Sequence, residues 1–424
     1  MSENASLFAI ANFRYYLTAR LASTLAQNAM VVVIGWQVYD IARRTMTTKE
    51  AAFQLGLVGI AQFLPLLLLT LVVGWVADHV DRRWIARSAI SLELICAGTL
   101  ALLAHYQMTT LPALFMIAAL LGVARAFAGP ALQALAPNLV PPALLPRMIA
   151  TNSIAWQSGA IAGPAMGGYL YAAGHPLPYE VATGLFAVSL TAMLLIGPIT
   201  RNIQKTGVKP WEQVIEGLRY VRRNRLVLGA ISLDLFAVLL GGATAMLPIY
   251  ARDILRVGPE GLGHLRAAPA AGAALTALYL SFRPLKKHVG PKMLAGVGVF
   301  GVATIIFGMS RWMPLSLLCL FLLGIGDMVS VFVRQSLIQI YTPDAMRGRV
   351  GAVSTLFISG SNELGEAESG ILAAAIGPVA AVILGGVGAI GVTLLWSRWF
   401  PELRNAATFD PPANLEILIQ ETKT

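Results

Sequence analysis

The stretch PPALLPRMIA, residues 141–150, recurs in the second half of the chain as PDAMRGRVGA, residues 343–352. Both copies follow the pattern P-x-A-x-x-x-R-x-x-A, and they lie 202 residues apart. At the same offset, SGAIAGPAMGG at 158–168 falls on GSNELGEAESG at 360–370. Self-similarity at one fixed offset predicts a chain built from two structurally similar halves.

The composition points to a membrane rather than to water. Of the 424 residues, 57% are hydrophobic and 12% are charged, whereas a soluble domain carries about 25% charged residues. Apolar runs of about 20 residues recur along the chain, and each is long enough to cross a bilayer. We therefore predict an all-α membrane protein with twelve transmembrane helices in two pseudo-symmetric six-helix bundles.

The expected spans lie near 14–39, 54–77, 84–104, 111–135, 149–173, 179–199, 227–251, 263–282, 292–309, 314–340, 350–375 and 378–399. They give an N-terminal bundle (1–199), a basic linker (200–226), a C-terminal bundle (227–400) and a tail (401–424).

The net charge of +10 is unevenly spread. Placing both termini in the cytoplasm puts most Lys and Arg residues on the cytoplasmic side, as the positive-inside rule requires. The densest basic segment, WEQVIEGLRYVRRNR at 211–225, is expected to be an amphipathic helix lying against anionic lipid headgroups. No folded basic domain surrounds it, so nucleic acid is not an expected partner.

Ionisable residues inside spans are costly, and they usually face a cavity or a partner. The candidates are Arg20, Glu93, Arg125, Asp234, Asp327, Arg334 and the glutamates of the eleventh span, Glu363, Glu366 and Glu368, of which Glu368 is expected to point away from the others. Asp234, Glu363 and Glu366 are the expected proton-coupling acids, and Arg20, Arg125, Arg334 and Asp327 the charges beside them. For each acid, a static structural pair is the alternative. Glu93 is expected near a span end or in a pair.

Polar residues within the spans fall into stripes at helical spacing. Arg20, Thr24 and Gln27 share one face of the first span, and Ser359, Asn362, Glu363 and Glu366 share one face of the eleventh. We expect both stripes to line a substrate cavity. Trp156 lies in mid-span, where it either contacts a flat apolar substrate or packs in the core.

Two short motifs accompany these spans. Between the second and third spans, Gly74, Asp78, Arg82 and Arg83 follow the pattern G-x-x-x-D-x-x-x-R-[KR]. Asp78 can pair with Arg82 or Arg147, or accept bonds from helix amides, and so hold a gate; a solvated mixed-charge loop is the alternative.

The second motif, G-x-x-x-G-P-x-x-G-G, lies in the fifth span and permits close helix packing and a bend. The alternative is a kink without a transport role. Its residues are Gly159, Gly163, Pro164, Gly167 and Gly168.

With these motifs, the chain resembles the major facilitator superfamily over essentially all of residues 1–400. The first motif is similar to the cytoplasmic loop signature of that superfamily, and the second to its antiporter and exporter motif. Residues 233–273 and 342–370 resemble the drug-efflux branch that includes the enterobactin exporter and macrolide efflux proteins. Asp81 departs from the usual glycine of the loop signature, and Lys287 replaces the acid in its second copy.

The sequence contains no G-x-x-x-x-G-K-[ST] loop, no catalytic constellation and no metal-ligand spacing among its five histidines. We therefore expect a transporter rather than an enzyme, with a proton gradient in place of any cofactor. The expected function is a proton-coupled exporter of amphipathic organic molecules such as siderophores or drugs, a monomer in the bacterial inner membrane. The alternatives are a symporter or lipid flippase on the same fold, and a transport-silent scaffold or sensor.

Overall fold

The computed structural model describes residues 7–198, 210–283 and 285–409, and every regular element in these ranges is helical. The chain forms two compact units. Unit 1 comprises residues 1–207 and 247–270, and unit 2 comprises residues 208–246 and 271–424.

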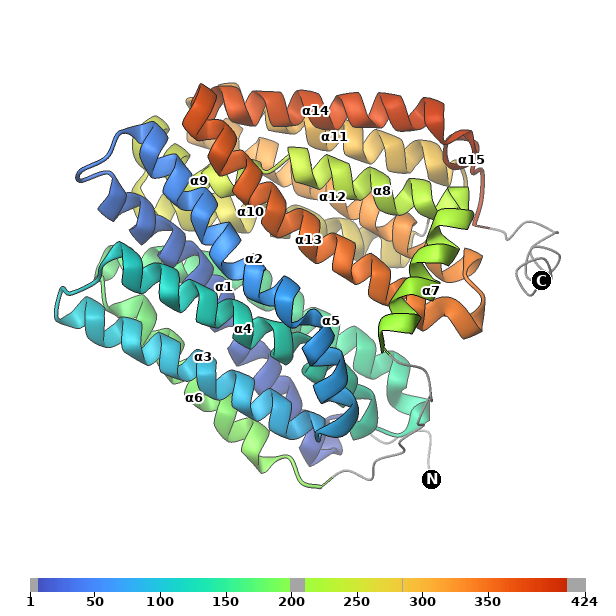
Figure 1. Ribbon diagram of the computed structural model, residues 1–424, viewed down its shortest axis with the longest axis horizontal. Helices are drawn as coiled ribbons and strands as arrows, with labels where there is room; N and C mark the ends of the chain where they lie inside the picture. Colours follow the sequence, from blue (N-terminus) through green and yellow to red (C-terminus); the bar gives the residue numbers. More distant parts are fainter. Residues whose placement is uncertain (1–6, 199–209, 284, 410–424) are drawn as a thin grey trace. The chain divides into compact units, whose positions relative to one another are not determined.

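Unit 1 is built on six long helices (Figure 1): α1 (Ala11–Ala42), α2 (Thr48–His79), α3 (Arg82–His105), α4 (Leu111–Leu135), α5 (Leu145–Ala173) and α6 (Leu177–Leu195). Helix α1 packs on α5 and α6, α2 packs on α4, and α3 packs on α4 and α6. Phe13 and Tyr16 of α1, Ile90 of α3, Leu132 of α4 and Met193 of α6 are buried together in one hydrophobic core.

Unit 2 repeats this packing scheme. It contains α7 (Pro210–Arg223), α8 (Arg225–Leu240), α11 (Val289–Met309), α12 (Met313–Tyr341), α13 (Asp344–Ile376), α14 (Pro378–Trp399) and α15 (Pro401–Arg404). Helix α8 packs on α13 and α14, and α11 packs on α12 and α14, as α1 and α3 do with their partners in unit 1. Helix α12 begins 202 residues after α4. The repeat in the sequence is thus a repeat in structure.

Several helices begin at side chains that satisfy their first backbone amides. Thr47 and Glu50 form a capping box at α2, with Thr47 N donating to Glu50 Oε2 at 2.8 Å. The carboxylate of Asp81 accepts from the amide of Arg83 at 2.9 Å and pairs with its guanidinium at 2.7 Å. The aspartate at the usual glycine position of the loop signature therefore caps α3.

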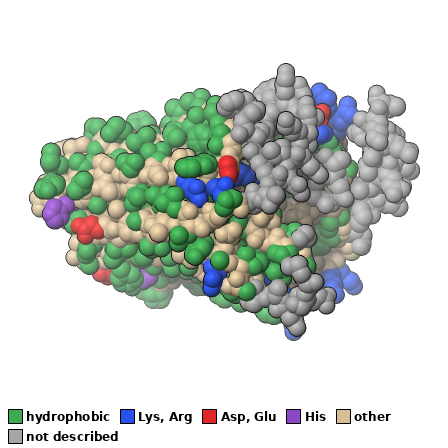
Figure 2. Space-filling model, turned by 90° about the horizontal axis from the view of Figure 1, so that it is seen from below, with side chains coloured by type: hydrophobic (Ala, Val, Ile, Leu, Met, Phe, Trp, Pro, Cys, Tyr) green, Lys and Arg blue, Asp and Glu red, His purple; other side chains and the backbone are tan. Residues whose placement is uncertain are grey.

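In the described part of the chain, nine helical stretches are long and apolar enough to cross a membrane. The three remaining expected spans fall on α5, α13 and α10 (Gly258–Phe282), whose glycines, prolines and charges lower their hydropathy. Large hydrophobic side chains such as Ile95, Leu102 and Met116 are exposed, and apolar side chains cover much of the face seen in Figure 2. Lipid tails would remove this surface from water.

Residues 247–270 come from the second half of the sequence but pack within unit 1. They form α9 (Leu247–Ile249), the π-helix η5 (Tyr250–Ile254) and the first part of α10. Asp253 pairs with Arg43 at 3.2 Å, and Arg252 pairs with Asp40 at 3.2 Å. Tyr39 donates its hydroxyl to Asp253 at 2.5 Å. Two neighbouring residues of η5 are thus tied reciprocally to the end of α1.

The densest part of the basic linker forms helix α7, which packs against α13. Glu216 forms an ion pair with Arg349, and the hydroxyl of Tyr220 donates to the carbonyl of Tyr341 at 2.5 Å. Val221 is buried, whereas Arg222 and Arg223 are exposed. Part of the apolar face expected against lipid is therefore covered by protein, and the basic face remains open.

Candidate functional site

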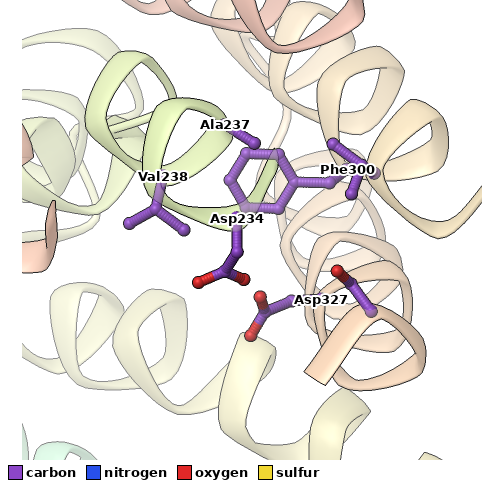
Figure 3. Close-up of a pocket in the computed structure, with 7 residues that line it drawn as sticks. Asp234, Ala237, Val238, Phe300 and Asp327 are labelled. Atoms are coloured by element: carbon purple, nitrogen blue, oxygen red, sulfur yellow. The ribbon is translucent and has the colours of Figure 1, made fainter. Parts of the chain in front are cut away.

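An ion pair between Asp234 of α8 and Arg334 of α12 lies inside unit 2. The two residues are only 4% and 2% exposed, so water does little to screen their charges. Charges buried this deeply are tolerated when they are paired. Asp327 lies about two turns before Arg334 on α12, and its carboxylate points toward that of Asp234 (Figure 3).

The two aspartates line a small pocket between α8, α11 and α12. Its lining residues are Asp234, Ala237, Val238, Val297, Phe300, Asp327 and Ser330. The pocket has room for about one water molecule. Two charges predicted separately from the sequence, Asp234 and Asp327, line this pocket together, and Arg334 joins them through its ion pair with Asp234.

Close packing of α11 on α12 holds this pocket in place. A Cβ on Gly296 would lie 2.7 Å from the carbonyl oxygen of Gly326, and a Cβ on Gly326 would lie 3.1 Å from the amide of Phe300. Only glycines allow the two backbones to approach this closely. The approach places Asp327, the residue after Gly326, and Phe300 on the same pocket.

Helix α13 packs against the end of α8. A Cβ on Gly365 would lie 2.8 Å from the carbonyl oxygen of Val238, one turn beyond Asp234. Glu366, the next residue of α13, is partly buried, and Asn362 is exposed. Ser359 and Glu363 lie outside the residues whose side chains are described. The fold thus brings the acidic helix alongside the helix of Asp234.

Unit 1 contains a second buried polar cluster, centred on Glu93 of α3. Glu93 is fully buried. Gln27 donates to its Oε1 at 2.6 Å, and Ser23 donates to its Oε2 at 3.4 Å. Arg20 lies one turn before Ser23 on α1, whereas Thr24 of the predicted stripe packs against Gly159 of α5. Glu93 is in the middle of α3 rather than near a span end, and it is paired with neutral donors.

Arg125 of α4 is fixed on a neighbouring helix. Its Nη1 donates to Oε1 of Gln62 on α2 at 2.8 Å. Gly122, one turn earlier, faces the backbone of Gln62 so closely that a Cβ there would clash. Gln62 was not expected from the sequence, because a lone glutamine in an apolar run carries no signal without knowledge of the neighbouring helix.

Replacing Gln27 with leucine should lower the free energy of unfolding by about 1–3 kcal/mol, because the buried carboxylate of Glu93 would lose its shortest hydrogen bond. The measurement is thermal unfolding of the purified protein in detergent. Gln133→Leu, at an exposed position of α4, is the matched control. Equal unfolding temperatures for the two variants would contradict the assignment.

The glycine motif of α5 faces α1. A Cβ on Gly159 would lie 2.6 Å from Thr24, one on Gly163 would lie 2.7 Å from Asn28, and one on Gly167 would lie 2.8 Å from the carbonyl oxygen of Ala29. Glycines four residues apart thus form a smooth track for α1. Pro164 and Gly168 are buried beside this track, and Gly168 approaches Gly263 of α10.

The remaining predicted residues are distributed over unit 1. Arg82 donates to the carbonyl of Ala134 at 2.9 Å, which ties the start of α3 to the end of α4. Thr24 is buried and donates to the carbonyl of Arg20, and Trp156 is 47% exposed. Gly74 and Asp78 lie outside the residues whose side chains are described.

Two units with the same internal helix packing, each holding charged side chains inside apolar helices, define a multi-pass membrane transporter of the major facilitator type. Solved structures share the fold. One is a D-xylose–proton symporter, with a TM-score of 0.70, 13% identity and coverage of 92% of this chain and 98% of that chain. Another is a bacterial homologue of the iron transporter ferroportin in an inward-facing state, with a TM-score of 0.66, 18% identity and coverage of 94% and 100%.

The chain belongs to the family described as transmembrane secretion effector, which it matches over residues 3–415. It is similar to the enterobactin exporter EntS of Escherichia coli O1:K1, with 27% identity over 391 residues, covering 90% of this chain and 91% of that protein. It is also similar to EntS of Citrobacter koseri, with 26% identity over 398 residues and 92% coverage of each chain. The family and these relatives are transporters rather than enzymes.

Proposed function

We propose that this protein is a proton-driven exporter of amphipathic organic molecules, such as siderophores or drug-like compounds, in the bacterial inner membrane. The buried pair of Asp234 and Arg334 beside Asp327 carries the proposal. The named function of the EntS relatives supports export. Both termini are proposed to be cytoplasmic and the working unit a monomer.

The pair supplies a simple proton switch. When Asp234 is ionised, it binds Arg334 and links α8 to α12. A proton on Asp234 removes its negative charge, so the link is lost and the two helices are free to shift. Release of the proton restores the pair. Glu363 and Glu366 on α13, which packs against α8, are proposed to take part in the same exchange, because coupling alternating access to protons requires a group that titrates between states.

Transport into everted membrane vesicles tests this function, with enterobactin and ethidium as cargo and a respiration-driven pH gradient. We expect protons to leave the vesicle lumen as cargo enters, and Asp234→Asn to reduce uptake to the level of vesicles without the protein. Glu368→Gln, at an acid of α13 that does not line the pocket, should transport at the parental rate. Immunoblots should show equal insertion of all variants.

Three outcomes would count against the proposal. Parental rates in Asp234→Asn, Glu363→Gln and Glu366→Gln alike would show that these acids do not couple protons. Cargo and protons moving in the same direction would indicate a symporter. Absence of any cargo-dependent proton movement would indicate a flippase driven otherwise or a transport-silent scaffold.

A further inference from the structure

The pocket in unit 2 holds one more negative than positive charge. Asp234 is balanced by Arg334, but Asp327 has no ion pair or hydrogen bond among the described side chains. An uncompensated carboxylate among apolar side chains is neutralised either by taking up a proton or by the arrival of one positive charge. One proton or one monovalent cation would balance the charge of Asp327.

Ser330 independently points to a ligand in the same pocket. It is 1% exposed, lines the pocket, and its hydroxyl has no hydrogen-bond partner. Serines and threonines in apolar helices usually bond back to a carbonyl one turn earlier, as Ser336 does to Phe332 at 2.8 Å on the same helix. The hydroxyl of Ser330 is instead available to a group that enters the pocket.

The rest of the lining indicates what kind of cation fits. Ala237, Val238, Val297 and Phe300 are apolar, whereas a bare metal ion of this kind prefers a shell of several oxygen atoms. An aromatic ring beside a carboxylate is a common environment for an organic ammonium group. The pocket has room for about one water molecule, which suits the head of a primary amine.

We propose that Asp327 and Ser330 bind the ammonium group of a cationic cargo molecule. The N–H groups would donate to the Asp327 carboxylate and to Ser330 Oγ, and Phe300 would cover the adjoining carbon. This inference rests on the proposed export function and names its substrate class.

Such a site makes cargo and protons compete. Both neutralise the same carboxylate, so each excludes the other, which is what exchange of protons for cargo needs. The charged group that lines the pocket with Asp327 is Asp234 from α8, which is paired with Arg334 of α12; α11 contributes only apolar lining residues. Helix α10 meets α12 through Gly272 beside the backbone of Phe321, and no described residue of α13 lines the pocket.

The first repeat carries a different residue at the position that corresponds to Asp327. At the repeat offset of 202 residues, Asp327 corresponds to Arg125 of α4. Arg125 bonds to Gln62, so the equivalent helix in unit 1 packs with the opposite charge at this position. The helix packing that the two units share therefore does not by itself call for a carboxylate at this position.

The test measures binding of n-hexylamine to the full-length protein in detergent by calorimetry, with n-hexanol and hexanoate as neutral and anionic counterparts. We expect only hexylamine to bind with saturation. Asp327→Asn should weaken it about tenfold or more, and Ser330→Ala by a smaller factor, as expected for loss of a charge-assisted and then of a neutral hydrogen bond. Glu368→Gln should bind like the parent.

The pH dependence gives a second readout that does not rely on Asp327→Asn being well folded. Affinity of the parent for hexylamine should fall as the pH is lowered, because protons then occupy the Asp327 carboxylate. In the pH range where Asp327 titrates, binding of hexylamine should release a proton. Ser330→Ala should keep this dependence. Binding without proton release at any pH would contradict competition at a carboxylate.

Other results would overturn the inference in defined ways. Equal binding of hexanol, or parental affinity in Asp327→Asn, would show that the site does not recognise ammonium. Displacement of hexylamine by NaCl but not by choline chloride would identify a sodium site instead. If hexylamine does not bind while Asp234→Asn still abolishes enterobactin uptake, the substrate class is wrong and proton-driven export stands. If hexylamine binds through Asp327 without any proton-coupled transport, the ammonium site stands and proton-driven export is wrong.

Discussion

Replacing Asp234 alone with leucine will destabilise the protein by about 3–5 kcal/mol, whereas replacing Asp234 and Arg334 together will recover most of that loss. The single change leaves the Arg334 guanidinium, 2% exposed, without its counter-charge. The double change replaces a buried ion pair with apolar side chains of comparable size, which is often close to neutral. Unfolding temperatures in detergent for the parent, both single variants and the double variant complete the cycle.

An exposed ion pair provides the control for this cycle. Arg225 and Glu402 pair at 2.9 Å, with side chains 60% and 41% exposed, and such pairs contribute about 0–1 kcal/mol. Arg225→Leu with Glu402→Leu should therefore show almost no coupling. If the coupling energy between Asp234 and Arg334 were as small as that of this exposed pair, the buried pair would not hold α8 to α12. The double variant should remain folded yet fail in vesicle transport, which separates stability from coupling.

Replacing Gly167 with leucine will prevent stable folding of unit 1. Its Cβ would lie 2.8 Å from the carbonyl oxygen of Ala29 and 3.1 Å from its Cα. Both are backbone atoms inside α1, which cannot rotate away as a side chain can, so the cost should exceed about 3 kcal/mol.

The matched control is Gly184→Leu on α6, where an added Cβ meets nothing within 4 Å. Size-exclusion chromatography of fluorescently tagged variants should show a monodisperse peak for Gly184→Leu and aggregate or loss of protein for Gly167→Leu. If both variants elute like the parent, the close contact of α5 with α1 is not required.

The fold was predictable because two independent patterns agree. Over the residues that the structure describes, hydropathy alone supports nine stretches, and it misses α5, α10 and α13, whose small, kinking or charged residues interrupt the apolar runs. The 202-residue repeat supplies α5 and α13, since each copy must contain the same helices. The prediction of a helical major facilitator transporter is confirmed by the family match and the shared fold.

The candidate site was predictable only in its parts. Asp234, Asp327 and Arg334 stand out as charges in apolar spans, yet a single sequence does not say which of many such charges meet. The pairing expected for Glu93 could not be assigned to particular residues, because its partners Gln27 and Ser23 lie on another helix. Ser330 could not be singled out from the sequence, because what marks it is a buried hydroxyl without a hydrogen-bond partner, which only the structure shows.

The η5 segment has a consequence for how the protein is made. Residues 247–270 complete unit 1, and they are translated only after the linker and α8. Until the chain has been translated through residue 270, Asp40 lacks its partner Arg252 and Arg43 lacks its partner Asp253. Assembly of this transporter is therefore expected to be interleaved. If the chain were cut in the linker, the first fragment would lack residues 247–270 of unit 1, and the second fragment would carry them without their partners.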